Sequence, residues 1–326
     1  MRKYVTVGAL AEHLQCPMMG DREKRLYGIA LMEESSDDML TYVPSDRIDR
    51  IEMLRAGAIL TRASIGLPLH RNYIYTRRDP YEMLVQAIQF LIDNGLYGSP
   101  CQTTPQIADD CMIGDYVSVG NGSEVGAGTL LSHGVVIGER VKIGKFCQIG
   151  ANTVIGSDSS IGDHTIIGSC CCIGTENFEY LQTPKSWIKI PVVGRAVIGE
   201  HVRIGGNVVI EKGTIGTTAI GSDTQIENLV QIGHEVRIGS GCHIVACTAI
   251  AGWAEIGDHV TIYGQSAVNN RIHVGNHAVL LARSGVDKPI ADDQIVSGSP
   301  AQNHHEEMRF QAFLRKLYRM RRKGGR

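Results

Sequence analysis

The sequence predicts a mainly β protein: a parallel β-helix of hexapeptide repeats, with a small N-terminal α/β domain and a C-terminal α-helix. The main observation is an aliphatic residue at every sixth position from Ile107 to Ile173, a period that resumes at Ile198 and, after a four-residue insertion before Ile220, runs to Val286. Small or β-branched residues stand four positions after these aliphatic residues in 107–167 and 220–280. Neither a helix nor an ordinary strand has this period.

Each hexad is expected to form a short strand and a turn, so that three hexads complete one triangular coil of about eighteen residues. Stacked coils pair their backbones about 4.8 Å apart and bury one continuous aliphatic column. Four cysteines fall on the small-residue positions and are expected to be packing residues: Cys111, Cys147, Cys171 and Cys242. No C-x-x-C pair occurs, so the cysteine spacing predicts neither a zinc site nor a redox motif.

Three regions are expected along the chain. Residues 1–100 mix strand and helix patterns, such as a strand at 56–61 and a helix at 79–95 between an Asp-Pro start and an Asn-Gly stop. Residues 101–302 form the β-helix. Residues 303–326 read as a basic amphipathic helix.

Composition excludes some functions. The net charge of −2 and the isoelectric point near 6.6 do not suggest a nucleic-acid-binding protein. The N-terminus has no apolar signal-peptide core, and no apolar run approaches the length of a membrane span. A cytoplasmic protein without a stable membrane span is therefore expected.

One histidine stands out in the motif "NLVQIGHEVRIG" at 228–239. Eighteen residues after His234 comes Gly252, so the glycine is expected directly above the histidine on one edge of the prism. A base beside an accessible backbone N–H is what acyl transfer requires, because negative charge builds on the thioester oxygen. Glu227 could hydrogen-bond the second ring nitrogen. Spacing alone does not separate His234 from the other histidines of the prism.

Three segments carry a resemblance to a known family: "ENFEYLQTPKSWIKIPVVGR" at 176–195, the insertion at 210–221, and "IENLVQIGHEV" at 226–236. They resemble the UDP-3-O-acylglucosamine N-acyltransferases of lipid A biosynthesis. The resemblance implies a left-handed β-helix, a homotrimer, and transfer of a 3-hydroxyacyl chain from acyl carrier protein to the amine of a UDP-linked glucosamine. It also implies that His234 is the general base, Glu227 the orienting acid and Gly252 the oxyanion contact, with no metal.

The resemblance also implies binding residues. Tyr42 would stack on uracil, and the other substrate-binding candidates are Ser45, Phe178, Tyr180, Lys189, Asn228, Gln231 and Arg271. Trp253 and Arg283 would line the acyl groove. Four residues of the C-terminal helix would dock the acidic carrier protein: Arg315, Arg319, Arg321 and Arg322.

The chain departs from the family pattern at several of these positions. Glu227 replaces an aspartate, Arg271 replaces a second histidine, Ile48 replaces a tyrosine that reads uracil, and Arg283 replaces an apolar groove residue. Since Trp253 and Arg283 would shorten or polarise the groove, an alternative is a short-chain acyltransferase that uses coenzyme A on a nucleotide-linked amino sugar. In both cases the acyl thioester is a co-substrate on phosphopantetheine. A non-catalytic β-helix scaffold and a zinc-dependent hexapeptide protein are also compatible with the repeat pattern.

Overall fold

The computed structural model describes residues 3–62, 70–78, 80–98 and 100–323, and these form two compact units. The first unit contains Met1–Pro100, Phe178–Gly194 and Thr214–Gly216, and the second contains Cys101–Asn177, Arg195–Gly213 and Thr217–Arg326. The sequence prediction placed 178–194 and 214–216 in the β-helix. They belong to the first unit instead, because their apolar side chains pack into its core, Ile190 fully and Leu181, Val193 and Ile215 partly buried.

The first unit is built on a four-stranded sheet in the order β2 (Met18–Met19), β6 (Tyr73–Thr76), β5 (Ala58–Arg62) and β4 (Leu40–Val43). Strands β4, β5 and β6 are parallel and β2 pairs antiparallel to β6. The predicted strand at 56–61 is β5, and the predicted helix at 79–95 is α2 (Pro80–Asp93). The remaining elements of the first unit are β1 (Val5–Thr6), α1 (Val7–His13), β3 (Arg25–Leu26), η1 (Met32–Glu34), η2 (Ser45–Met53), and the hairpin β19 (Tyr180–Gln182) and β20 (Trp187–Lys189).

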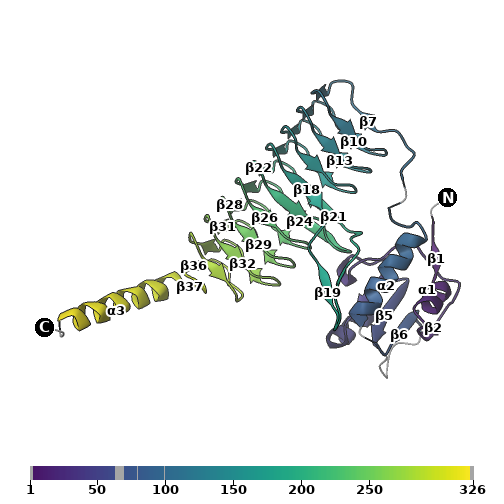
Figure 1. The fold of residues 1–326 in the computed structure, drawn as a ribbon, viewed down its shortest axis with the longest axis horizontal. Coiled ribbons are helices and arrows are strands. Elements are labelled where there is room, and N and C mark those ends of the chain that lie inside the picture. The colour runs from purple at the N-terminus through teal and green to yellow at the C-terminus, as the bar shows by residue number, and fades with distance from the viewer. Residues whose placement is uncertain (1–2, 63–69, 79, 99, 324–326) are drawn as a thin grey trace. The chain divides into compact units, whose positions relative to one another are not determined.

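The second unit is a parallel β-helix with three flat faces (Figure 1). Face 1 comprises nine strands: β7 (Gln106–Ile107), β10 (Glu124–Val125), β13 (Lys142–Ile143), β16 (Ser160–Ile161), β21 (Arg195–Ile198), β24 (Thr217–Ile220), β27 (Arg237–Ile238), β30 (Glu255–Ile256) and β33 (His273–Val274).

Face 2 comprises eleven strands, of which only the last pair is antiparallel: β8 (Met112–Ile113), β11 (Leu130–Leu131), β14 (Gln148–Ile149), β17 (Ile166–Ile167), β22 (Arg203–Ile204), β25 (Gln225–Ile226), β28 (His243–Ile244), β31 (Thr261–Ile262), β34 (Val279–Leu280), β36 (Ile295–Ser297) and β37 (Gln302–Asn303). Face 3 comprises nine strands: β9 (Ser118–Val119), β12 (Val136–Ile137), β15 (Val154–Ile155), β18 (Cys172–Thr175), β23 (Val209–Glu211), β26 (Gln231–Ile232), β29 (Ala249–Ile250), β32 (Ala267–Val268) and β35 (Gly285–Val286).

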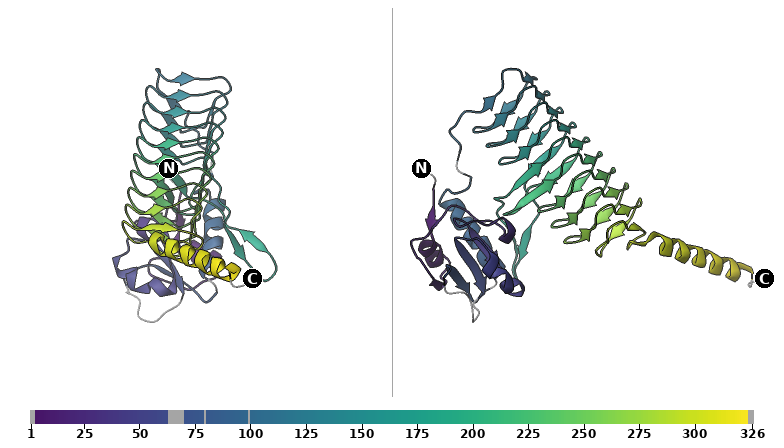
Figure 2. Two further views of the ribbon diagram at one scale, coloured as in Figure 1. Left: turned by 90° about the vertical axis from the view of Figure 1, so that its left-hand side faces the viewer. Right: turned by 180° about the vertical axis from the view of Figure 1, so that it is seen from behind.

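The hexad pattern explains this architecture. Strands eighteen residues apart pair in register, for example Ile137 with Ile155, so the coils stack along the prism (Figure 2). Their aliphatic side chains form one buried column. The small residues fill the interior corners. Cys147, Cys171 and Cys242 are buried there and Cys111 packs against the same core, which confirms the packing prediction. Burial raises the pKa of the Cys147 thiol.

Most corners are two-residue turns whose second residue has a positive φ, such as 57° at Arg140 and 63° at Trp253. Non-glycine residues rarely adopt this left-handed conformation, and here the strand pairing on both sides of the turn imposes it. The corners thus present pairs of side chains at a constant vertical spacing.

The last strand leads into helix α3 (His304–Lys323), which projects from the end of the prism (Figure 1). Its acidic residues Glu306 and Glu307 lie in the first turn, where the helix dipole favours them. Within the described residues, no helix combines the length and the apolar character that crossing a bilayer requires.

Candidate functional site

His234 is the first residue of a turn between β26 on face 3 and β27 on face 1, which we call the 3–1 corner. Its side chain is 15% exposed, and its Nδ1 lies 2.6 Å from Oε2 of Glu235, the second residue of the same turn. The Glu235 side chain is 2% exposed. The histidine is thus held at a partly open corner by an almost completely buried carboxylate.

Gly252 lies directly above His234, as the eighteen-residue spacing predicts. The backbone N–H of Trp253 donates to the carbonyl of His234, and a Cβ added to Gly252 would lie 2.6 Å from Nε2 of His234. Nε2 therefore lies beside Gly252, in the space that a side chain there would need. A side chain at this position would displace the imidazole.

The backbone N–H of Gly252 is the second feature of the corner. At many corners the first N–H is capped by a side chain of the coil above, as when Asp258 accepts from Ser240 at 2.8 Å. Above Gly252 stands Asn270, whose own N–H donates to Asn269. Among the hydrogen bonds of the described chain, the Gly252 N–H donates to no acceptor. It is a free donor next to the imidazole.

The backbone of His234 is capped from below. Because Gly252 has no side chain to offer, the N–H of His234 donates to Oε2 of Glu211 at 3.1 Å, while Oε1 of Glu211 accepts from Gln231 at 3.3 Å. Glu211 ends β23, just where the four-residue insertion interrupts the hexad pattern. The insertion thereby supplies the carboxylate that holds the His234 turn.

Trp253 and Arg271 continue the same corner upward. The Trp253 ring lies edge-on to the imidazole, with ring centroids 6.4 Å apart, and the Arg271 guanidinium carbon lies 5.9 Å from the Trp253 centroid. Trp253 Nε1 is buried and makes no hydrogen bond with the described residues. Three of the predicted site residues, His234, Gly252 and Trp253, are therefore close together, with Arg271 beyond them.

Glu227, the predicted orienting acid, lies at a different corner of the prism from His234, and its role stays a prediction. Glu227 precedes His234 by seven residues, and one side of the triangular coil takes six. Glu227 therefore lies at the preceding corner, between β25 on face 2 and β26 on face 3, which we call the 2–3 corner. Its Oε2 accepts from the backbone N–H of Ala246 at 3.2 Å, while Glu235 occupies Nδ1 of His234. Neither Glu235 nor Glu211 was predicted from the sequence. The signal that could have identified Glu235 is that it directly follows His234 in the same two-residue turn.

Two other predicted residues also lie at the 2–3 corner. Asn228 accepts a hydrogen bond from the N–H of Gly206 at 2.7 Å and so caps that turn. Arg283 is exposed and donates to Oε1 of Gln265 at 2.9 Å. Its place in the acyl groove stays a prediction, because in a single chain the side chain lies exposed on the outside of this corner.

The predicted nucleotide-binding residues lie in the first unit. Tyr42 is half-buried in β4, and the side chain of Ser45 lies outside the described part of the structure. Phe178 is 83% exposed and packs edge-on against Tyr180, with ring centroids 5.0 Å apart. Lys189 pairs with Tyr180 across the β19–β20 hairpin. The hairpin therefore presents aromatic and cationic side chains together.

The predicted docking residues lie on α3, where Arg315, Arg319 and Arg321 are exposed; the side chain of Arg322 is outside the described residues. The same helix exposes an apolar stripe consisting of Met308, Phe310, Phe313, Leu314, Leu317, Tyr318 and Met320.

Comparisons with known proteins agree with this architecture. Residues 104–139 and 140–175 match the family model "Bacterial transferase hexapeptide (six repeats)". The chain is 45% identical over 145 residues to UDP-3-O-acylglucosamine N-acyltransferase 1 of Gloeobacter violaceus, covering 44% of this chain and 42% of that protein. It is 42% identical over 156 residues to UDP-3-O-acylglucosamine N-acyltransferase of Rhizobium meliloti, covering 47% of this chain and 44% of that protein.

The chain thus spans less than half the length of these curated relatives. Among solved structures, UDP-N-acetylglucosamine acyltransferase of Francisella novicida is similar with a TM-score of 0.46 and 24% identity, over 65% of this chain and 71% of that one. Residues 104–175 of the chain therefore carry bacterial transferase hexapeptide repeats, and close to half of the chain is similar in sequence to the UDP-3-O-acylglucosamine N-acyltransferases.

Proposed function

We propose that the protein is an N-acyltransferase that moves an acyl group, of the 3-hydroxyacyl type, from a thioester to the amine of a UDP-linked glucosamine in lipid A biosynthesis. The observation that carries this proposal is the juxtaposition of His234 Nε2 with the unpaired N–H of Gly252. A base and an amide donor at one corner match the two demands of acyl transfer, removal of a proton and stabilisation of an oxyanion. The named relatives support the same reaction.

In this mechanism His234 Nε2 takes the proton of the amine as its nitrogen attacks the thioester carbon. The carbonyl electrons move to oxygen, which the Gly252 N–H stabilises in the tetrahedral intermediate. Collapse of the intermediate breaks the carbon–sulfur bond, and the thiolate takes the proton back from the imidazolium. The products are an amide and a free thiol. Every proton is accounted for by the single imidazole, so no metal is needed.

Acceptor recognition is assigned to the first unit. Tyr42 offers a partly buried ring for stacking on a pyrimidine, and the exposed Phe178 and Tyr180 offer two more. The ammonium of Lys189 suits a diphosphate. Asn228 and Gln231 already make hydrogen bonds within the prism, so the structure favours them less as substrate-binding residues. Asn228 accepts from the N–H of Gly206, and Gln231 donates to the Glu211 carboxylate.

Acyl carrier protein is the proposed donor, which would place the reaction in the cytoplasm. The last two turns of α3 concentrate arginine and lysine residues and contain no acid, which suits a strongly acidic partner. Coenzyme A remains the alternative donor, and the bulk of Trp253 beside Gly252 favours a short acyl group in that case.

A homotrimer is proposed for the assembly. Face 1 carries exposed charges, including the Glu124–Lys142 pair, whereas faces 2 and 3 expose apolar side chains such as Met112 (59%) and Val136 (42%). The 2–3 corner adds exposed Tyr116 and Leu229. Packing face 2 of one chain against face 3 of the next would cover these groups in a closed ring. Sedimentation equilibrium tests this: a monomeric mass at micromolar concentration would contradict it.

The activity is tested by incubating the protein with a panel of UDP-amino sugars and acyl thioesters and weighing the products by mass spectrometry. We expect an increase by one acyl group on a UDP-glucosamine carrying a free amine, and none on the N-acetylated sugar. Transfer to no member of the panel would overturn the proposed function. The His234→Ala variant serves as the control for uncatalysed acylation.

The donor is tested by reversing Arg315, Arg319 and Arg321 to glutamate. We expect slower turnover with the carrier-protein donor, most strongly at low salt where screening is weakest, and unchanged turnover with the coenzyme A thioester. Equal turnover of the native and reversed proteins with both donors would count against a docking role of α3 and favour coenzyme A as the donor.

A further inference from the structure

Glu235 differs from the other residues at its position along the 3–1 corner. The side chains of Arg140 and Asp158, in the equivalent second position of the turn, are 36% and 43% exposed, and Arg271 is exposed as well. Glu235 has the same left-handed backbone, with a φ of 53°, yet its carboxylate is 2% exposed and faces an imidazole nitrogen. Burying a carboxylate is costly unless it is paired, so this placement needs an explanation in terms of its partner.

We infer that Glu235 is the positioning residue of His234: its carboxylate accepts a hydrogen bond from Nδ1–H and so leaves the lone pair of Nε2 for the substrate amine. This inference rests on the proposed acyl transfer at His234. It assigns to the adjacent residue of the same turn the role that the family resemblance gave to Glu227.

The chemistry follows from the two nitrogens of the ring. A neutral imidazole carries one N–H, and the nitrogen that makes a hydrogen bond to an acceptor is the one that keeps it. A carboxylate on Nδ1 therefore selects the tautomer whose Nε2 can accept a proton. When Nε2 takes the amine proton, the imidazolium is formed 2.6 Å from a carboxylate, which stabilises it as the reaction proceeds.

The corner also fixes the direction of the ring. Glu211 holds the N–H of His234 at 3.1 Å from below, and Glu235 holds Nδ1 from the side. Nε2 is then directed at Gly252, where a Cβ would lie only 2.6 Å away. Two acids, neither of which needs to contact substrate, thus orient the base toward the oxyanion donor.

The tautomer is measured without turnover. Histidine labelled with ¹⁵N at Nδ1 is incorporated, and the His234 signal is assigned by solid-state NMR from the difference between the native protein and a His234→Asn variant. At about pH 9, where an ordinary imidazole is neutral, we expect a protonated Nδ1 in the native protein and its loss in Glu235→Ala. An unprotonated Nδ1 in the native protein would overturn the inference.

Kinetics test the consequence for the reaction. Glu235→Gln keeps the shape of the side chain but removes its charge, and we expect kcat to fall about ten- to a hundredfold while KM for the sugar stays within about twofold. Glu235→Asp should restore part of the loss because the charge returns. Asp258→Asn is the matched control: it neutralises an acid that caps a turn at another corner and should leave kcat unchanged.

The outcomes separate the two proposals. Full activity in His234→Ala would overturn the proposed function itself, whatever the NMR result. An inactive His234→Ala together with a fully active Glu235→Gln would overturn only the role of Glu235. A large loss in Glu227→Gln with none in Glu235→Gln would transfer the role to Glu227. Thermal unfolding of each variant shows whether a loss of activity reflects a loss of fold.

Discussion

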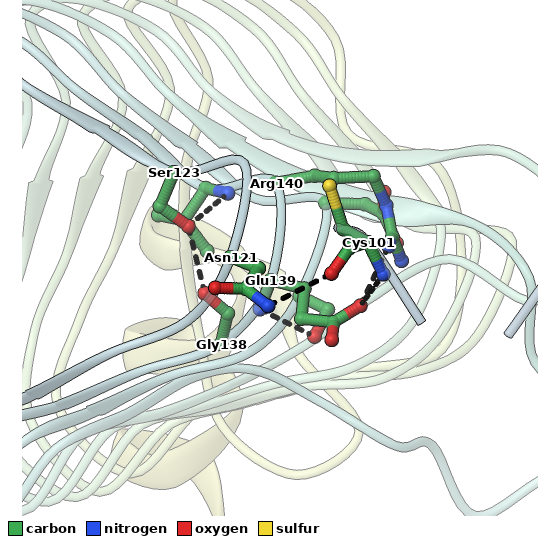
Figure 3. A network of polar contacts seen from close by, with 9 residues as sticks. Cys101, Asn121, Ser123, Gly138, Glu139 and Arg140 are labelled. Atoms are coloured by element: carbon green, nitrogen blue, oxygen red, sulfur yellow. Dashed lines mark hydrogen bonds and ion pairs between the residues drawn. The ribbon is translucent and has the colours of Figure 1, made fainter. Parts of the chain in front are cut away.

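The 3–1 corner is used in two ways along the same prism. Near the beginning of the prism it is closed: Arg140 donates to Asp158 at 2.7 Å. Arg140 also donates to Glu139 at 2.8 Å, and the Glu139 carboxylate in turn accepts from the N–H of Cys101 at 3.1 Å (Figure 3). Asn121 donates to the carbonyl of Cys101 at 2.8 Å. This network fastens the incoming chain to the first coils.

Further along, the same corner is open. Ser157 caps the N–H of Glu139 from the coil above at 3.0 Å, whereas the equivalent residue above His234 is Gly252, which has no side chain to cap anything. The backbone conformation of the two turns is the same. The difference thus lies in two side chains and not in a different fold: Gly252 offers none to the turn below it, where Glu211 caps the N–H of His234 instead, and Asn270 above it does not cap the Gly252 N–H beside the base.

Removing the base should have the largest effect. His234→Ala should lower kcat by about 10²–10⁴-fold and leave the unfolding temperature close to native, because the prism core does not contain this side chain. Initial rates with the preferred donor and acceptor, together with circular dichroism, measure both quantities. Near-native turnover would mean that the open corner is not the reaction centre.

Closing the corner with a methyl group should come next. Gly252→Ala places a Cβ 2.6 Å from Nε2 of His234, too close for the ring to stay in place. We expect kcat to fall about 10²–10³-fold, because the imidazole is displaced and the methyl group hinders access to the N–H. Gly206→Ala is the matched control, since Gly206 also begins a turn, and its added Cβ would come no closer than 3.3 Å, to the carbonyl of Ser169. Equal effects of the two substitutions would point to general strain.

Loosening the cap below the base should have a smaller effect. Glu211→Gln weakens the hydrogen bond to the His234 N–H without removing a reacting group, and we expect kcat to fall by up to about tenfold through misorientation. A stronger loss than in Gly252→Ala would contradict this ranking. Steady-state rates for both variants, measured with the same substrate preparation, decide it.

Opening the closed corner should have the smallest effect. The hydrogen bond to Asp158, together with the charge of Glu139, raises the pKa of Arg140, but the pair is partly exposed, so Arg140→Ala should cost only about 1 kcal/mol of stability. Turnover should not change, because this stretch has no catalytic role. Urea unfolding monitored by circular dichroism measures the first quantity, and a fall in kcat would show that the two stretches are coupled.

Much of the fold could be predicted because each hexad of the sequence forms one side of a coil and three hexads form one complete coil. Every sixth residue points inward, and every eighteenth lies one layer higher, so the burial of Ile155 and the position of Gly252 above His234 follow from counting. Charge and composition along the last segment likewise predicted the helix α3. These features depend only on local backbone geometry repeated many times.

The hexad pattern thus predicts the prism, its packing cysteines and the vertical neighbours at each corner. The contact of Glu235 with Nδ1 of His234, the cap from Glu211 below it, and the packing of 178–194 with the first unit are visible only in the folded chain. Periodicity specifies which corner a residue occupies, but not the direction of its side chain. That direction depends on neighbouring coils, on the insertion after Ile210, and on which core offers burial.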